Sequence, residues 1–233
     1  MVQSVAIIVA GGSGKRMSYD VPKQYLLLDG IPILGRTLIQ FEMTSSVDRI
    51  VLVVPEEDMD YVRDEITDRY NVHKVKHIRA GGETRQDSVR NGLEMVDVTD
   101  DVIVVHDGVR PFPSKKLIDF TIMEAARHGA AIPVVPSTDT VKVIDKDGFI
   151  RDTLDRGTLR LVQTPQAFRR EIILEAYRNA YRERFYGTDD ASLVERLGVP
   201  VKTVPGFYDN IKITTPDDLA LGELLLKKIG SGI

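Results

Sequence analysis

The sequence contains no cysteine among its 233 residues. Disulfide bonds, catalytic thiolates and zinc–cysteine sites are therefore excluded. No apolar stretch approaches the length of a membrane span, and the N-terminus lacks the basic segment and apolar core of a secretory signal. These absences predict a cytoplasmic protein that does not work at a membrane.

Positive charge is not in excess either. The chain carries 31 Lys and Arg against 35 Asp and Glu, for a formal net charge of −4. Proteins that wrap nucleic acid are usually basic, so we expect no nucleic-acid partner. The sequence shows no internal repeat and no low-complexity linker, and its length suffices for a buried core. We therefore predict a single domain over residues 1–233.

Apolar runs of strand length alternate with helix-like segments through the first two-thirds of the chain. The runs cover residues 5–9, 50–54, 75–78, 102–105 and 130–135. Such alternation predicts an α/β fold with a doubly wound, mostly parallel sheet that is covered on both faces. Further along the chain we predict helices near 169–184 and 189–197, a strand near 201–204, and a helix that begins at Thr215.

The alternation breaks between residues 137 and 166. Val141 and Val143 alternate with polar residues, and Asp147-Gly148 forms a turn signal. The pattern predicts an inserted β-hairpin arm. A lone hairpin is marginal in water, so the arm must pack on a second copy of the chain or on its own domain. The sequence of the arm favours neither of these two arrangements over the other.

A glycine-rich loop follows the first apolar run. Gly11, Gly12 and Gly14 allow backbone N–H groups to approach an anion, and the cations Lys15, Arg16 and Lys23 follow. The loop therefore predicts phosphate binding. It is not a P-loop, since Val9 occupies the first glycine position and Arg16 the hydroxyl position; Met17 similarly breaks the dinucleotide fingerprint.

Polar residues gather at two further strand ends. The run 75–78 is followed by Gly81, Gly82, Glu83, Arg85 and Ser88, and the run 102–105 by the segment 106–111. Ligands of an open parallel sheet bind beyond the carboxyl ends of its strands, so we expect these segments to meet at one site.

Three charged residues near this expected site admit two interpretations each. Asp107 is either a magnesium ligand or the cap of a turn. Arg110 pairs with a phosphate or forms a surface ion pair. Lys212 lies between Ile211 and Ile213 in what resembles a strand, so it points away from both, toward solvent or toward the site.

Several segments together resemble the 2-C-methyl-D-erythritol 4-phosphate cytidylyltransferase family, in the same order and at compatible spacing along nearly the whole chain. They are residues 10–17, 22–24, 106–111, 164–166, 188–191 and 209–212. The resemblance implies a Rossmann-like nucleotidyltransferase fold and a homodimer with exchanged β-arms. It also implies Mg²⁺ as cofactor and the transfer of CMP from CTP to a polyol phosphate, with release of pyrophosphate. The segment 109–112 is similar to ribitol 5-phosphate cytidylyltransferases, which makes ribitol 5-phosphate the alternative acceptor.

The resemblance also implies a role for individual residues. Arg16 and Lys23 would stabilise the charge that develops on the α-phosphate. Arg156 and Lys212 would position the incoming phosphate. The remaining substrate-binding residues would be Arg110 and Thr140 beside that phosphate, Gly82, Glu83 and Ser88 at the cytosine and ribose, Asp107 at the ribose or metal, Thr188 at the erythritol, and Ala10, Gly11, Gly12, Ser13, Gly14, Gly108 and Thr164 elsewhere in the site. A phosphate nucleophile is already anionic, so the absence of a Ser/His/Asp or Cys/His arrangement agrees with this chemistry.

Overall fold

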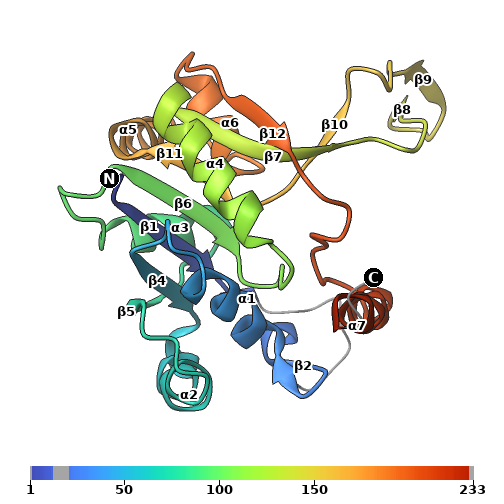
Figure 1. Ribbon diagram of the computed structural model, residues 1–233. Helices are drawn as coiled ribbons and strands as arrows, with labels where there is room; N and C mark the ends of the chain where they lie inside the picture. The colour runs from blue at the N-terminus through green and yellow to red at the C-terminus, as the bar shows by residue number, and fades with distance from the viewer. Residues whose placement is uncertain (1, 13–20, 231–233) are drawn as a thin grey trace.

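The computed structural model describes residues 2–12 and 21–230 and contains an eight-stranded sheet (Figure 1). Four parallel strands form one half of it, in the order β6-β1-β4-β5. They are β1 (Ser4–Val9), β4 (Arg49–Val54), β5 (Val75–Ala80) and β6 (Val102–Asp107). Each corresponds to a predicted apolar run, and the α/β prediction is confirmed.

The other half of the sheet contains antiparallel pairs. It consists of β7 (Ala130–Pro136), β10 (Arg160–Val162), β11 (Gln166–Arg169) and β12 (Lys202–Pro205). β11 lies between β6 and β7 and is antiparallel to both, while β12 runs parallel to β7. Ala131 of β7 faces both Ala167 and Lys202, so β11 and β12 lie at opposite edges of β7. The strand β11 was not among those that the sequence predicted.

Helices cover both faces of the sheet. They are α1 (Ile33–Glu42), α2 (Met59–Val62) between the short helices η2 (Glu56–Asp58) and η3 (Arg63–Asp68), α3 (Arg85–Leu93), α4 (Lys115–His128), α5 (Arg170–Arg182), α6 (Asp190–Arg196) and α7 (Pro216–Gly230). Ala6 and Ile8 of β1 belong to one buried cluster with α1, α2 and α4, whereas Val5, Ile7 and Val9 belong to another with α3, α5 and α6. Burial on both faces explains why β1 is continuously apolar.

A small group of short elements lies beside the main sheet. The short helix η1 (Lys23–Tyr25) precedes a two-stranded sheet of β2 (Leu27–Leu28) and β3 (Ile31–Pro32), and α7 packs against it (Figure 1). Within the described parts of the chain, no helix has the length and apolar character needed to cross a membrane.

The predicted hairpin is present and projects from the body. β8 (Lys142–Ile144) pairs antiparallel with β9 (Ile150–Thr153), and the two form a sheet of their own (Figure 1). The projecting part is shorter than the predicted range 137–166, because β10 pairs with β7 and returns the chain to the main sheet. We refer to residues 138–159 as the arm.

Candidate active site

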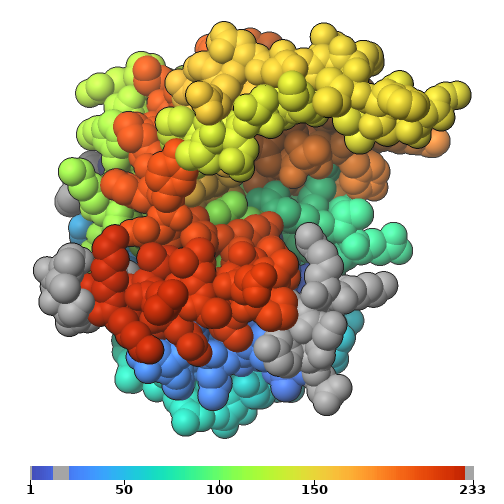
Figure 2. Space-filling view, turned by 90° about the vertical axis from the view of Figure 1, so that its right-hand side faces the viewer, coloured from blue at the N-terminus to red at the C-terminus, as the bar shows by residue number. Residues whose placement is uncertain are grey.

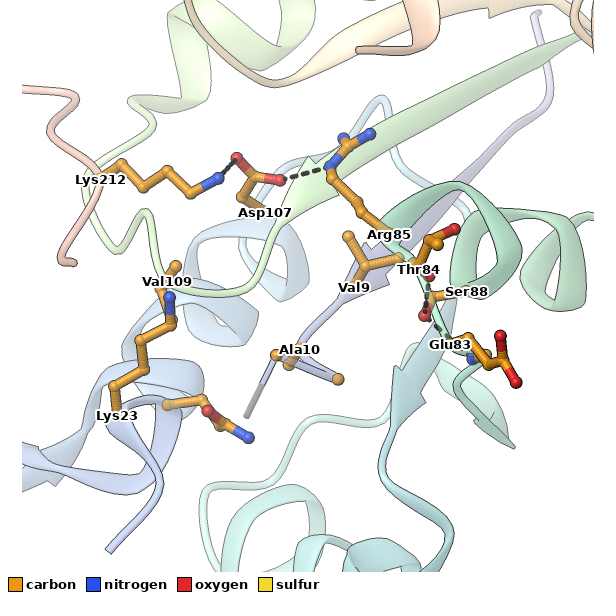
Figure 3. A pocket seen from close by; sticks show the side chains of 14 residues that line it. Val9, Ala10, Lys23, Glu83, Thr84, Arg85, Ser88, Asp107, Val109 and Lys212 are labelled. Carbon is orange, nitrogen blue, oxygen red and sulfur yellow. Dashed lines mark hydrogen bonds and ion pairs between the residues drawn. The ribbon is translucent and has the colours of Figure 1, made fainter. Parts of the chain in front are cut away.

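A cavity of about 380 Å³ opens at the carboxyl ends of β1, β5 and β6 (Figure 3). The three strand ends singled out in the sequence therefore meet, as expected for an open parallel sheet. The cavity is lined by Val9, Ala10, Gly11, Gly12, Lys23, Gln24, Gly82, Glu83, Thr84, Arg85, Ser88, Asp107, Val109 and Lys212.

The loop before α3 is held in one conformation by local hydrogen bonds. Thr84 caps α3 in a capping box with Asp87. Ser88 Oγ accepts a hydrogen bond from the Gly82 N–H at 3.1 Å and donates one to the Thr84 carbonyl at 3.0 Å. A Cβ on Gly82 would lie 2.3 Å from Asp87 Cβ, so only glycine fits there. The loop thus presents a fixed backbone to the cavity.

Asp107, at the end of β6, is surrounded by three cations. Its Oδ1 lies 3.0 Å from Arg85 Nε, and its Oδ2 lies 2.8 Å from Lys212 Nζ and 3.6 Å from Arg110 Nε. The side chain is only 9% exposed. Burial alone raises the pKa of Asp107, but the three cations outweigh it and hold that pKa well below its usual range. The carboxylate is therefore ionised.

A buried hydrogen-bond chain fixes the turn after Asp107. The Asp107 N–H donates to Thr164 Oγ1 at 3.1 Å, and Thr164 Oγ1 lies 3.0 Å from His106 Nδ1. His106 Nε2 lies 3.0 Å from the Arg110 carbonyl, which only accepts, so we assign the ring proton to Nε2 and let the Thr164 hydroxyl donate to Nδ1. Burial lowers the pKa of His106 to about 3, which keeps the ring neutral.

A second cavity of about 440 Å³ lies on the other side of Asp107. Its lining comes from β7, β10, the segment before β11 and α6; it consists of Arg85, Asp107, Arg110, Ile132, Val162, Gln163, Thr164, Gln166, Thr188, Asp189, Ser192, Glu195 and Lys212. Arg85, Asp107 and Lys212 line both cavities. Figure 3 shows these three side chains in a row, with the Asp107 carboxylate between the two cations. We call this row the seam.

The structure brings most of the candidate residues to the two cavities. Those that line the first are Ala10, Gly11, Gly12, Lys23, Gly82, Glu83 and Ser88; those that line the second are Arg110, Thr164 and Thr188; Asp107 and Lys212 line both. Gly108 lines neither of them. Its N–H donates to the Val9 carbonyl at 2.8 Å, and a Cβ there would lie 2.8 Å from that of Ala10, so Gly108 allows close packing of β6 on β1.

Other candidates lie elsewhere. Ser13, Gly14 and Arg16 fall outside the described residues. Thr140 and Arg156 belong to the arm and line neither of the two cavities within the part of the chain that is described. Arg156 is exposed, and its Nη1 donates to the Thr138 carbonyl at 3.1 Å.

The structure places two of the three residues that were left with open interpretations, Arg110 and Lys212. Arg110 is not a surface residue: it is mostly buried, with Nη1 2.9 Å from the Asn210 carbonyl. Lys212 points into the site. The strand expected around it is wrong, because residues 211–214 form no strand and Ile213 is buried in a cluster with residues of β2, α1 and α7. Lys212 and Ile213 still point in different directions, as in a strand, although this segment pairs with no strand.

Sequence reasoning did not assign a role to Arg85. It opens α3, where a cation opposes the helix dipole and carboxylates are preferred. That unfavourable position is a signal in the sequence that the side chain serves another purpose. In the structure Arg85 joins Asp107 to Asp190 of α6.

Comparisons with known proteins agree along nearly the whole chain. The family model described as 2-C-methyl-D-erythritol 4-phosphate cytidylyltransferase matches residues 4–228. The protein of that name from Syntrophus aciditrophicus is 56% identical over 224 residues, 96% of each chain, and that from Geobacter metallireducens is 48% identical over 96% of this chain and 97% of its own. A crystal structure of 4-diphosphocytidyl-2C-methyl-D-erythritol synthase from Anaerococcus prevotii superposes with a TM-score of 0.86 at 35% identity, covering 97% of this chain and 96% of its own.

Proposed function

This chain belongs to the 2-C-methyl-D-erythritol 4-phosphate cytidylyltransferase family, and we propose that the two cavities that meet at the seam are where it carries out that reaction. The enzyme transfers CMP from CTP to 2-C-methyl-D-erythritol 4-phosphate, a step of non-mevalonate isoprenoid biosynthesis. The product is 4-diphosphocytidyl-2-C-methyl-D-erythritol, and pyrophosphate leaves. The relatives carry methylerythritol phosphate in their names, so ribitol 5-phosphate is not favoured as the acceptor.

One observation supports placing the reaction here: the cations of the seam, Arg85 and Lys212, line both cavities. The first cavity, with its glycine-rich edge and Lys23, suits the nucleotide, and the second suits the acceptor. An oxygen of the acceptor phosphate attacks the α-phosphorus of CTP. The bond from that phosphorus to the bridging oxygen of the β-phosphate breaks, and its electron pair leaves with pyrophosphate. No proton needs to move, because the nucleophile is already an anion.

The protein's task is to position two anions that repel each other and to stabilise charge in the transition state. Lys23 lies at the nucleotide side, where it would meet the α-phosphate. Arg110 lines the acceptor cavity and Lys212 lines both cavities, so both would reach the incoming phosphate. The fixed loop at Gly82 and Ser88 would bind the base and ribose, and Thr164 and Thr188 would contact the acceptor.

Magnesium would meet one carboxylate here, that of Asp107, whose two oxygens already face Arg85 and Lys212, so phosphate oxygens and water would have to supply most of its ligands. Within residues 2–12 and 21–230, no group of three or more His, Cys, Asp or Glu side chains could hold a metal ion. Asp107 is ionised and lines both cavities. Mg²⁺ in proteins usually takes one or two carboxylates and completes its shell with phosphate oxygens and water. Bound there with CTP, Mg²⁺ would neutralise part of the charge on the triphosphate.

The arm supports a homodimer in which each protomer completes its partner's site. Its apolar side chains are exposed, among them Ile144, Phe149 and Ile150. Figure 2 shows the arm in yellow along the top of the view, extending past the body at the right. Burying these side chains against a second copy would remove apolar surface from water. The same contact would bring Thr140 and Arg156 to the acceptor side of the partner's seam.

Both substrates are multiply charged phosphates that do not cross a bilayer unaided. We therefore place the enzyme in the cytoplasm, with the enzymes that make them.

Pyrophosphate release across a panel of substrates tests the function. CTP, ATP, GTP and UTP are each combined with methylerythritol phosphate or ribitol 5-phosphate in the presence of MgCl₂. We expect release with CTP and methylerythritol phosphate, and little with any other pair. Equal rates with ribitol 5-phosphate, or binding of CTP without turnover, would overturn the assignment.

A further inference from the structure

Arg85 is held by a carboxylate at each end of its guanidinium group, unlike Lys212, the other cation of the seam. Its Nε lies 3.0 Å from Asp107 Oδ1, and its Nη2 lies 2.8 Å from Asp190 Oδ2. A planar guanidinium can bridge two carboxylates in this way, whereas an ammonium group acts as a single point charge. Arg85 therefore connects the seam to the body of the protein.

The second carboxylate is itself firmly held. Asp190 is 1% exposed, and its Oδ1 accepts a hydrogen bond from the Tyr177 hydroxyl of α5 at 2.6 Å. The adjacent Asp189 caps α6 and accepts a hydrogen bond from Gln166 at 2.8 Å. The line Tyr177–Asp190–Arg85–Asp107 thus runs from α5 to the end of β6. We call it the brace.

Lys212 contacts a carboxylate at one point, the other oxygen of Asp107. It is 37% exposed and extends from residues 211–214, which form no helix or strand. Its ammonium group lies 2.8 Å from Asp107 Oδ2 and faces both cavities. A cation that is to bind an incoming phosphate must first weaken its bond to Asp107.

The ease with which Lys212 leaves Asp107 for a phosphate depends on Arg85, because the cations compete for one carboxylate. Arg85, Arg110 and Lys212 all share the single charge of Asp107. If Arg85 were displaced, the full attraction of Asp107 would fall on the other two cations, and in a poorly solvated site this attraction is strong. Lys212 and Arg110 would then be less available to a phosphate.

We propose that Arg85 is a positioning residue that holds Asp107 through the brace and so leaves Lys212 and Arg110 available to the acceptor phosphate. The inference rests on the proposed function, because it assigns the second cavity to the acceptor. It predicts a selective defect: the acceptor binds more weakly, while CTP bound alone is affected little.

Two single variants weaken the brace without removing its charges. Arg85→Lys keeps the cation but cannot bridge both carboxylates, and Tyr177→Phe removes only the hydroxyl that supports Asp190. Steady-state kinetics should show KM for methylerythritol phosphate raised about tenfold by Arg85→Lys and about threefold by Tyr177→Phe, as expected for hydrogen bonds to charged groups. The Kd of CTP, measured by calorimetry without acceptor and without Mg²⁺, should change less than about twofold.

Tyr181→Phe is the matched control. Tyr181 lies one turn further along α5, and its hydroxyl also donates to a carboxylate, that of Asp87, which lies outside the brace. This variant should leave KM for the acceptor unchanged. If Tyr177→Phe and Tyr181→Phe raise that KM equally, or if the brace variants weaken CTP and acceptor to the same extent, the brace has no positioning role.

A paired variant keeps the test decisive if Arg85→Lys does not fold. Arg85→Gln combined with Asp190→Asn removes the bridge without leaving a bare charge in the interior. It should raise KM for the acceptor at least as much as Arg85→Lys, and an unchanged KM overturns the inference. Absence of turnover by the wild-type enzyme would instead overturn the proposed function. Failure of the inference and failure of the proposed function are therefore distinguishable.

Discussion

Cations of the body and of the arm are held in opposite ways. Arg85, Arg110 and Lys212 lie around a buried carboxylate of their own chain. Arg156, on the arm, is exposed and donates to the Thr138 carbonyl. Under the proposed function, cations of both groups would meet the two phosphorylated substrates. The contrast teaches that one chain holds the cations of the seam in place by its own contacts, whereas the arm would need a further contact to take part in the proposed site.

The apolar side chains show the same contrast. Every residue of β1 is buried, and its side chains contribute to the clusters on both faces of the sheet. All four residues of β9 are exposed, and a hairpin of this size is marginal in water without such support. The body is therefore stabilised by its own core, whereas the arm has little core of its own.

Complementation between two inactive variants tests this division most strongly. Lys23→Ala damages the body of a protomer and Arg156→Ala damages its arm, and each alone should reduce kcat by about 10²–10³-fold, as for the loss of one group that stabilises transition-state charge. If arms are exchanged, a mixed dimer contains one intact site. Refolding the two variants together in equal amounts should then restore about a quarter of wild-type activity, because half of the dimers are mixed and one of their two sites works.

The matched control is a mixture of Lys23→Ala with the double variant Lys23→Ala/Arg156→Ala, in which no intact site can form. Thermal unfolding of each single variant should resemble that of the wild type, since both side chains lie at the surface of a cavity or of the arm. Recovery no greater than in the control would show that the arm serves its own protomer.

The pH dependence of unfolding should distinguish the buried turn of the body from the arm. His106 has a folded-state pKa of about 3, below its ordinary 6.5, so only the unfolded chain takes up its proton as the pH falls through 6.5. The stability present above pH 6.5 should be lost progressively down to about pH 3, at about 1.4 kcal/mol per pH unit, or about 2 kcal/mol by pH 5. The low pKa of Asp107 adds a further loss only below its ordinary 3.8.

Urea unfolding between pH 6.5 and 5 measures the slope of the unfolding free energy against pH. His106→Asn should flatten it. An unchanged slope in His106→Asn would mean that the ring is not buried neutral in the turn.

The sequence predicted the parts of the fold and site that local pattern determines. The run 5–9 marks a strand because burial on both faces demands continuous apolar residues. The meeting of the loops at Gly11, Gly82 and Asp107 followed from the direction of parallel strands alone. β11 gave no such signal, because it is four residues long and begins with Gln166 and ends with Arg169; its pairing with β6 and β7 makes it a strand.

Contacts between site residues that are far apart in the sequence could not be predicted from local sequence pattern. Arg85, Asp107 and Asp190 are far apart in the sequence, and only the packing of α3, β6 and α6 joins them. The position of Arg85 nevertheless indicates a special role, since a cation at the first position of a helix is unfavourable without a partner. Asp107, by contrast, admitted a capping role from the sequence, and its three cations became evident only in the fold.

A pair of isoleucine-to-valine substitutions makes the smallest and finest comparison between body and arm. Ile8→Val deletes one methylene from the buried core and should cost about 0.5–1.5 kcal/mol of unfolding free energy at any protein concentration. Ile150→Val removes the same group from the arm, where the side chain is 64% exposed, and in the monomer should cost less than about 0.5 kcal/mol. Because a dimer would bury Ile150, its variant should instead weaken self-association, measured by sedimentation over a dilution series. If the two variants destabilise the dilute protein equally, the arm belongs to the cooperative core of its own chain. A concentration-dependent defect confined to Ile150→Val would show that a second copy supplies the core that the arm lacks.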